Sequence, residues 1–234
     1  MSKKKYFIFS DIHGNLKALS KALEENGFEL DNENHILISL GDNFDRGNEN
    51  LMVLMFLKHF SDLDRLLMIR GNHDDFLLNF LLGKDNGIFN VRYNGLGRTL
   101  IEFSDEDSNT TEKIRNSINK NYPFLIPLLE NMKDKIEIGN KVLTHAGYSL
   151  DIRDNTWFID NFSDTAKFVY KYDPKDKIYI FGHFHAERLN LIFKDKKSNE
   201  IFQYRNFIGI DGNTYRNNKV HIIILDELGN IIKK

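Results

Sequence analysis

The sequence predicts an α/β (α+β) protein in which two packed mixed β-sheets are flanked by helices. Short apolar runs end abruptly in Gly- and Asp-rich clusters, helical patterns separate the first three runs, and the later runs follow without a long helix between them. Strand, helix and strand in succession is the crossover pattern of parallel pairing, whereas directly successive strands suggest antiparallel neighbours. A mixed sheet assembly follows from the two patterns together.

The first part of the chain alternates expected strands with expected helices. Buried strands are predicted at residues 6–10, 36–40 and 66–70, because each is a short apolar run that ends in a polar cluster. Apolar residues at helical spacing predict helices at residues 16–25 and 49–60, and a helical stretch is expected after Asp74, up to Leu82. This order indicates parallel strands joined by crossover helices.

The middle of the chain is less regular. A polar, irregular region is expected up to residue 108, followed by helices around residues 111–120 and 124–133. Residues 76–140 are interpreted as a helical insertion or cap within a single domain of residues 1–234, since no repeat, low-complexity tract or linker divides the chain. Strands are then expected at residues 141–144, 178–181, 189–193, 201–208 and 220–225.

Composition restricts the classes of partner and metal site. A formal net charge of −2 gives no global reason to expect a nucleic-acid or membrane partner. The absence of cysteine excludes disulfides and thiolate metal sites, so metals would be held by His, Asp and Asn, a set that suits Mn, Fe, Zn or Mg. No apolar run is long enough for a signal-peptide core or a membrane span, so a cytoplasmic protein is expected.

Five polar clusters follow the proposed strands and contain five of the eight histidines. They are Asp11-Ile12-His13, the segment from Gly41 to Gly47, Gly71-Asn72-His73-Asp74, His145-Ala146-Gly147 and Gly182-His183-Phe184-His185. Any one of them can be read as a turn with local hydrogen bonds. Because strand ends of such a sheet converge on one crevice, the five together predict a metal site, and the remaining histidines are interpreted as structural.

Together these motifs resemble the calcineurin-like metallophosphoesterases, in which D-x-H, G-D-x-x-D-R-G, G-N-H-[ED], a lone His and G-H form one dinuclear site. All five occur here in order, and the resemblance covers most of the chain outside residues 76–141. The form G-D-N-F-D-R-G, with Arg70 before Gly71, resembles the phosphoprotein-phosphatase branch of bacterial or phage type. The resemblance implies hydrolysis of phosphate monoesters by a metal-activated water, as in serine/threonine protein phosphatases.

The resemblance also implies a set of ligands for two divalent metal ions, with Mn as the first expectation. Asp11 and His13 would bind the first metal, Asp42 would bridge both, and the second would be bound by Asn72, His145 and His183. Two dications about 3.5 to 4 Å apart need anionic charge between them, which a bridging carboxylate supplies. The wider superfamily pattern G-H-x-H makes His185 a further ligand of the first metal; the alternative is an outward-facing side chain or one behind the ligands.

Four residues are implied to act on the substrate. His73 would protonate the leaving alcohol while Asp45 orients its imidazole ring, and the alternative is a purely structural hydrogen bond between them. Arg46 and Arg70 would bind the phosphate oxygens, a task suited to the planar guanidinium group, although either could instead form a surface ion pair. The expected partner is a phosphorylated protein or a small phosphoester.

Two departures from the branch pattern keep other functions open. Ile159 of Trp157-Phe158-Ile159 stands where branch members place a third phosphate-binding Arg. Either another residue such as Arg153 supplies this charge, or the site binds phosphate with two arginines only. A bis(5′-nucleosyl)-tetraphosphate hydrolase is the alternative enzyme, since bacterial relatives with similar first three motifs cleave that anhydride. A metal-bound scaffold without catalysis is the alternative that Ile159 suggests. Near the end, residues 208–213 loosely resemble the N-I-D-T-G segment of bacterial branch members, with no role implied.

Overall fold

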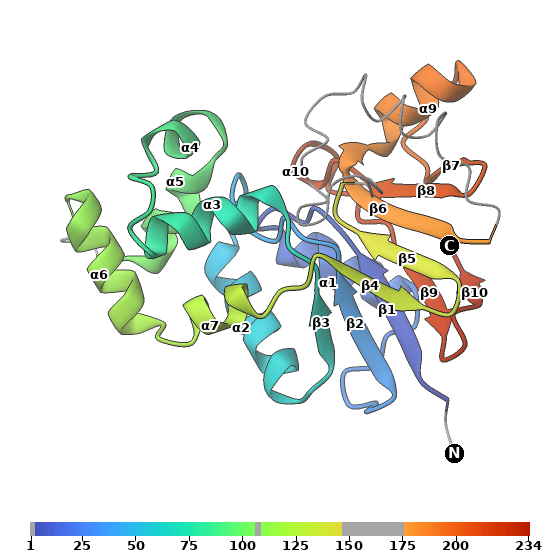
Figure 1. Ribbon diagram of the computed structural model, residues 1–234, viewed down its shortest axis with the longest axis horizontal. Helices are drawn as coiled ribbons and strands as arrows, with labels where there is room; N and C mark the ends of the chain where they lie inside the picture. Colours follow the sequence, from blue (N-terminus) through green and yellow to red (C-terminus); the bar gives the residue numbers. More distant parts are fainter. Residues whose placement is uncertain (1–2, 106–108, 147–175) are drawn as a thin grey trace.

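The computed structural model describes residues 3–105, 109–146 and 176–234, and it contains two five-stranded sheets with helices around them (Figure 1). The first sheet has the order β10-β9-β1-β2-β3. Its strands are β1 (Lys5–Phe9), β2 (His35–Ser39), β3 (Leu66–Met68), β9 (Ile223–Asp226) and β10 (Ile231–Lys233). Strands β1, β2 and β3 pair in parallel, whereas β9 is antiparallel to both β1 and β10.

The second sheet has the order β4-β5-β6-β8-β7. Its strands are β4 (Lys135–Ile138), β5 (Lys141–Thr144), β6 (Ile178–His185), β7 (Phe202–Tyr204) and β8 (Phe207–Asp211). The three inner strands β5, β6 and β8 are parallel, and the edge strands β4 and β7 are antiparallel to their neighbours. The predicted α/β architecture of two mixed sheets with helices is therefore confirmed.

Helices gather on the outer faces of the sheets and at one end of the molecule (Figure 1). The helices are α1 (Leu16–Glu25), α2 (Asn50–Asp62), α3 (Asn72–Leu81), α4 (Ile88–Tyr93), α5 (Leu96–Phe103), α6 (Thr111–Asn121), α7 (Leu125–Glu130), α9 (Ala186–Lys194) and α10 (Thr214–Asn217). None of the described helices is long and apolar enough to cross a bilayer.

The apolar core has three parts that correspond to the layers. Between the sheets, aliphatic side chains such as Ile8, Ile38 and Ile180 are fully buried and pack together. A second cluster joins the first sheet to helices α1, α2, α3, α5, α6 and α7, with Phe44 and Phe103 in edge-to-face contact at 5.7 Å between ring centroids. A third cluster packs α9 on the outer face of the second sheet. Burial on both faces explains why the central strands are continuous apolar runs rather than alternating ones.

Several expected elements differ from the structure. Residues 189–193, predicted as a strand, lie in α9, where Ala186, Leu189 and Asn190 are buried at helical spacing and Leu191 is 49% exposed. Residues 201–208 are two strands, β7 and β8, joined by a turn. A short apolar run does not distinguish a half-buried helix from a strand, which accounts for the first error.

Three further differences concern the middle of the chain and the direction in which the later strands pair. The region predicted as irregular contains α4 and α5, each preceded by a glycine with positive φ at Gly87 or Gly95. Strand β4 lies within the predicted insertion but belongs to the second sheet. The antiparallel pairing expected for the later strands was wrong for β6 and β8, which are parallel because α9 forms the crossover between β6 and the β7–β8 hairpin.

Candidate dinuclear metal centre

The five polar clusters meet at the carboxyl ends of β1, β2, β3, β5 and β6, as the sequence predicts. Asp42 lies at their centre: its Oδ2 is 3.8 Å from His13 Nε2 and its Oδ1 is 3.4 Å from His145 Nε2. Two groups of His and Asp side chains could each hold a metal ion, because the ligand atoms within each group lie within 4.8 Å of one another. Asp42 belongs to both groups. One group adds His13 and His73, and the other adds His145 and His183. This shared position is the one that a bridging carboxylate would occupy.

Negative charge is concentrated at this point inside the protein. Asp11, Asp42 and Asp211 are each at most 3% exposed. Burial raises the pKa of both Asp42 and Asp211 well above the ordinary value, and the neighbouring Asp11 carboxylate raises it further. Buried carboxylates that repel one another are stabilised by bound cations, so the donor set fits divalent metal ions.

Two histidines are oriented as metal ligands by backbone carbonyls. His13 Nδ1 lies 2.9 Å from the Phe44 carbonyl oxygen, and His145 Nδ1 lies 2.8 Å from that of Leu40. When Nδ1 donates a hydrogen bond, the ring exposes an unprotonated Nε2, which in both residues faces Asp42. Burial also lowers the pKa of His13 well below its ordinary value, which favours the neutral, ligating form.

Asn72 and His183 complete the side of the centre predicted for the second metal. Asn72 is the first residue of α3, and its Oδ1 lies 3.2 Å from His145 Nε2. The backbone N–H of His183 donates to Asp11 Oδ2 at 2.9 Å, and burial lowers the pKa of the His183 ring well below its ordinary value. These contacts place Asn72 beside His145 and His183 near Asp42, and their function as ligands of the second metal stays a prediction.

Gly182 permits the close approach of β6 to Asp11. A Cβ atom at this position would lie 2.2 Å from Asp11 Oδ2 and 1.9 Å from the hydroxyl of Ser10, which itself donates to Asp11. No real side chain tolerates such distances, so the Asp11 carboxylate can occupy its position only beside a glycine.

His185 lies beside a buried acid that the sequence analysis left without a role. Its Nδ1 is 4.0 Å from Asp211 Oδ2, and it is a buried nitrogen with no hydrogen-bond partner among the described residues. Asp211 ends β8 and pairs in register with His185, while the N–H of Asn213 donates to its Oδ1 at 2.7 Å. The function of His185 as a metal ligand stays a prediction; the structure adds Asp211 beside it.

His73 and Asp45 form the predicted pair. His73 Nδ1 donates to Asp45 Oδ2 at 2.7 Å, and both side chains are fully buried. The other carboxylate oxygen accepts a hydrogen bond from Thr99 Oγ1 at 2.6 Å, although burial still raises the pKa of Asp45 to about 7. His73 Nε2 then faces the centre, 4.0 Å from Asp42 Oδ2.

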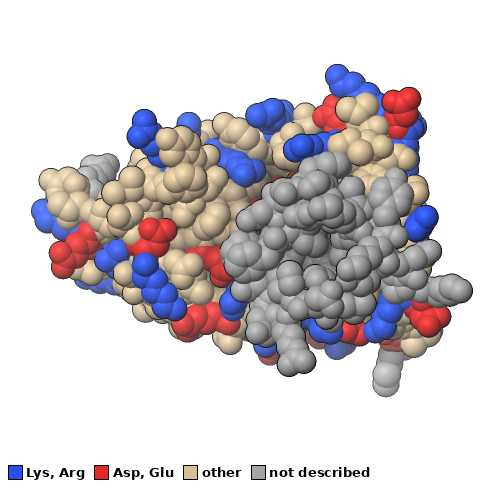
Figure 2. All heavy atoms as spheres, turned by 45° about the horizontal axis from the view of Figure 1, so that its top comes forward, with Lys and Arg blue, Asp and Glu red and all other residues tan. Residues whose placement is uncertain are grey.

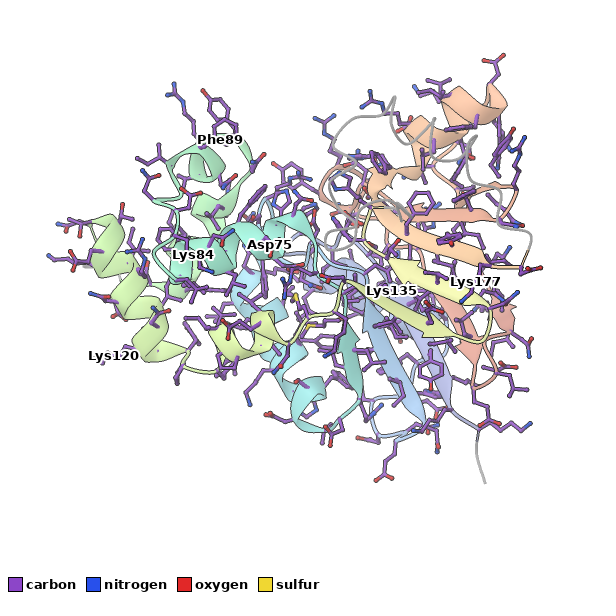
Figure 3. The ribbon with its side chains drawn as sticks, in the orientation of Figure 1. Asp75, Lys84, Phe89, Lys120, Lys135 and Lys177 are labelled. Carbon is purple, nitrogen blue, oxygen red and sulfur yellow. The ribbon has the colours of Figure 1, made fainter. Side chains whose placement is uncertain are left out.

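The two arginines predicted to bind phosphate lie in different places. Arg46 donates from Nη1 to His13 Nε2 and from Nη2 to His73 Nε2, both at 2.9 Å, so its guanidinium group lies at the centre. Arg70 instead reaches the carbonyls of Glu130 and Met132 at 3.4 Å, and its Nε is 3.7 Å from Asp75 Oδ1 on α3 (Figure 3). Phosphate binding by Arg70 therefore stays a prediction that these contacts do not support.

Backbone strain coincides with the site. Eleven described non-glycine residues have positive φ, and six of them are predicted site residues: Asp11, His13, Asp42, Asp45, Arg46 and His183. Such conformations cost about 1 to 3 kcal/mol each and persist where the surrounding structure enforces them, often at functional sites. The strain supports a functional interpretation of these loops over ordinary turns.

Sequence reasoning missed three supporting residues. Asp74 was quoted in its motif without a role, yet its Oδ2 accepts hydrogen bonds from the N–H groups of Asp42 and Gly71 at 2.9 and 3.0 Å. Thr99 gave no signal, because it lies 54 residues from Asp45 in a region predicted to be irregular. Asp211 stands at the end of an apolar run, but no histidine is next to it in the sequence, so it was not recognised as part of a polar cluster. The positions of Arg153, Trp157 and Ile159 lie outside the described residues.

Comparison with known proteins agrees with this geometry. Residues 4–206 match the family model described as calcineurin-like phosphoesterase. The chain is 35% identical over 108 residues to a mouse protein named serine/threonine-protein phosphatase with EF-hands 1, an alignment covering 44% of this chain and 16% of that protein. It is 29% identical over 148 residues to bis(5′-nucleosyl)-tetraphosphatase PrpE (asymmetrical) of Anoxybacillus flavithermus, covering 61% of this chain and 57% of that one. The matches thus span less than two thirds of either relative.

Solved structures show the same fold. A crystal structure described as a candidate diadenosine tetraphosphatase superposes with a TM-score of 0.65 at 17% identity, covering 98% of this chain and 92% of that chain. A serine/threonine phosphatase from Saccharomyces cerevisiae gives a TM-score of 0.55 at 13% identity, covering 89% and 67%. From the extent of the family match, with which the fold agrees, the chain belongs to the calcineurin-like phosphoesterase family.

Proposed function

We propose that this chain hydrolyses phosphate esters with two divalent metal ions, Mn²⁺ foremost, bound around Asp42. The first ion would be held by Asp11, His13, His185 and Asp42, and the second by Asp42, Asn72, His145 and His183. The observation that carries the proposal is the membership of Asp42 in both groups of ligand atoms. When bound, two such ions lower the pKa of a water molecule and stabilise charge on the attacking and leaving oxygens.

The protein's own contribution to the reaction is to position phosphate and to supply a proton. Arg46 contacts His13 Nε2 and His73 Nε2, and its guanidinium group would exchange these contacts for two oxygens of a bound phosphate. Because His73 Nδ1 donates to Asp45, its Nε2, which accepts from Arg46, is the nitrogen that would carry the transferable proton once Arg46 binds phosphate instead. From there His73 would protonate the leaving oxygen, while Asp45 and Thr99 keep the ring in place.

Two substrate classes remain candidates for this site. The G-D-N-F-D-R-G motif and the mouse relative support a phosphorylated serine or threonine side chain. The PrpE relative supports the phosphoanhydride of a dinucleoside tetraphosphate. The intact ligand set, with its acid and orienting carboxylate, argues against a scaffold without catalysis.

The first experiment separates these classes. Metal would be removed, Mn²⁺ restored, and initial rates compared on a phosphoserine or phosphothreonine peptide and on diadenosine tetraphosphate. Faster peptide hydrolysis would support a protein phosphatase, and faster cleavage of the dinucleotide would support an enzyme of nucleotide metabolism. No hydrolysis of either compound or of an aryl phosphate would contradict the proposed function.

The helical part of residues 76–140 is proposed to determine which substrate reaches the centre. Its helices α4, α5 and α6 lie at one end of the molecule, away from the second sheet (Figure 1). The N–H of Arg46 donates to the carbonyl of Gly95, and Thr99 contacts Asp45, so this segment is attached directly to the catalytic loop. We treat it as an insertion within a single domain of residues 1–234.

A further inference from the structure

A cationic cleft opens beside the candidate metal centre. It has a volume of about 820 Å³, within the range typical of small-molecule sites, and Arg46 and His185 lie in its wall. The same Arg46 contacts His13 and His73, so the cleft is continuous with the place where the scissile phosphate would bind. A substrate held at the centre would extend into it.

Four further basic side chains line this cleft: Arg98, Arg188, Lys197 and Arg216. All four are exposed, and they come from opposite walls, since Arg98 is on α5 whereas Arg188 is on α9 and Arg216 on α10. Glu187 is the one acidic residue among the lining side chains of the described chain. Figure 2 shows Lys and Arg side chains on this face between the helical end of the molecule and α9.

The positive charge of the cleft reaches the metal centre. Arg46, Arg188 and Arg216 line the cleft together with His185, which is a predicted ligand of the first metal. Within the part of the chain that the structure describes, neither Arg98 nor Arg216 forms an ion pair with a carboxylate. Clustered like charges in a cleft repel one another and attract a polyanion.

Two tyrosines add flat apolar surface at the same place. Tyr93 on α4 and Tyr215 on α10 both line the cleft, with exposed fractions of 64% and 51%. Exposed aromatic rings next to phosphate-binding cations are a surface on which a nucleobase can stack. A single phosphoserine would use neither the outer cations nor the rings.

We propose that this cleft, formed by Arg98, Arg216, Lys197 and the two tyrosines, binds the phosphate chain and base of a nucleoside polyphosphate whose scissile phosphate lies at the metal centre. The inference rests on the proposed function for the position of the reacting phosphate. It assigns specificity to side chains outside the catalytic clusters, contributed by the helical segment on one wall and by α9 and α10 on the other. The chemistry recognised is a chain of several phosphates, in contrast to an isolated phosphomonoester.

The first test measures binding without turnover. Calorimetry on the Mn²⁺-loaded protein at fixed free metal would compare inorganic tripolyphosphate with orthophosphate. We expect tripolyphosphate to bind at least about tenfold more tightly, because it adds charge-assisted contacts outside the centre. Replacing Arg98→Ala and Arg216→Ala together should reduce this ratio to below about threefold. Arg205→Ala is the matched control and should leave the ratio of the two affinities unchanged. Arg205 lies in the turn between β7 and β8, at the end of β8 opposite Asp211.

The second test identifies the base. Tyr215→Ala should weaken binding of adenosine 5′-tetraphosphate by about tenfold while leaving the affinity for tripolyphosphate unchanged. Equal affinity for tripolyphosphate and orthophosphate in the unaltered protein would overturn the proposal. The proposal would also be overturned if the double arginine variant lost hydrolysis of an acidic phosphopeptide but kept hydrolysis of nucleotides. Failure to hydrolyse p-nitrophenyl phosphate would count against the proposed function alone, since calorimetry reports on the cleft independently.

Discussion

At the scale of single residues, three histidines of the site each use one ring nitrogen for a contact that orients the ring and turn the other nitrogen toward the centre. His73 donates to Asp45 through one nitrogen and faces Asp42 and Arg46 with the other. His13 and His145 are held through Nδ1 by backbone carbonyls, which turns Nε2 of each ring toward Asp42; Arg46 contacts that of His13. This arrangement separates groups that would hold metals from the group that would transfer a proton, although both kinds are histidines in adjacent loops.

That separation makes a prediction for His73. We expect His73→Asn to lower kcat on p-nitrophenyl phosphate by about 10²- to 10⁴-fold, because the leaving oxygen loses its acid. Bound metal, measured by mass spectrometry of the purified protein, should remain nearly unchanged. His59→Asn on α2, outside the site, is the control and should not alter turnover. Turnover of His73→Asn equal to that of the unaltered protein would show that the acid has been wrongly identified.

A second prediction concerns Asp211, which lies beside His185 Nδ1, a nitrogen without a hydrogen-bond partner among the described residues. Carboxylates behind a ligating histidine orient the ring, and their loss typically weakens metal binding by about 10- to 100-fold. Asp211→Asn should therefore raise the Kd for Mn²⁺ by that factor, while saturating metal restores most of the turnover. Asp195→Asn, at the C-terminal end of α9, is the control. An unchanged Kd would remove Asp211 from the site.

At the scale of elements, the helical segment contacts the proposed catalytic loop through α5. Thr99 on this helix both donates to Asp45 Oδ1 and accepts from the Asp45 N–H at 3.0 Å. Asp45 itself has φ of 74°, so its loop depends on such contacts to hold an uncommon conformation. The helix therefore positions the residue that in turn positions His73.

Removing this hydroxyl should reduce turnover through Asp45. A hydrogen bond to a charged group contributes about 1.5 to 3 kcal/mol, so we expect Thr99→Val to lower kcat by about tenfold or more. The KM for p-nitrophenyl phosphate should change little, because the phosphate ligands remain. Thr99→Ser restores the hydroxyl and should restore kcat. If Ser and Val variants behaved alike, packing rather than the hydrogen bond would be the cause.

The edge of the second sheet carries a charge pattern that makes stability depend on pH. Glu137 on β4 accepts from Lys135 at 2.8 Å and from Lys177 at 2.5 Å, and these bonds lower its pKa to about 2 (Figure 3). Because the folded pKa lies below the ordinary value of 4.5, the contribution to the free energy of unfolding is complete above that value and is lost as pH falls toward about 2.

Glu137→Gln should therefore lower Tm slightly at pH 7 in low salt, and this difference from the unaltered protein should shrink toward zero near pH 2. The effect is small because all three side chains are about 40% exposed. Thermal unfolding followed by circular dichroism across this pH range provides the measurement. Glu24→Gln, on the exposed face of α1, is the control. A difference that persisted at low pH would exclude the ion pairs as its origin.

At the scale of the whole molecule, the candidate metal centre draws its residues from both sheets. Asp11 and Asp42 follow strands of the first sheet, whereas His145 and His183 belong to the ends of the second. Bound metal would link both sheets through these ligands and would neutralise the buried carboxylates. Metal binding should thus stabilise the entire fold as well as enable catalysis.

We expect the melting temperature to rise when Mn²⁺ is added after chelation. A ligand at 100 times its Kd adds about 2.7 kcal/mol, which for a chain of this length raises Tm by roughly 5 to 10 °C. Asp42→Asn should raise Tm in the metal-free state, because it relieves repulsion among buried carboxylates, and should abolish most of the response to Mn²⁺. A variant with the same metal-induced rise as the unaltered protein would contradict the bridging position of Asp42.

How much of this could be predicted depends on the range of the interactions. The five clusters are local patterns, each written in a few consecutive residues after an apolar run, so the sequence alone indicated the strands, the convergence of the clusters and the candidate ligands. The strand predicted at residues 189–193 was wrong because half-burial of a short apolar run depends on what packs against it, here the outer face of the second sheet.

The sequence by itself determined the fold class and the five polar clusters, because side-chain type and strand-end placement are properties of contiguous segments. The resemblance of these clusters to the calcineurin-like metallophosphoesterases indicated the family and implied the central position of Asp42. Only the tertiary structure decided that Thr99 supports Asp45, that Asp211 lies beside His185, that Arg70 reaches away toward Glu130 while Arg46 reaches inward, and that basic side chains from α5, α9 and α10 line one cleft. These contacts join residues that are far apart along the chain. They form when elements pack against one another, and no local pattern encodes which distant surfaces will meet.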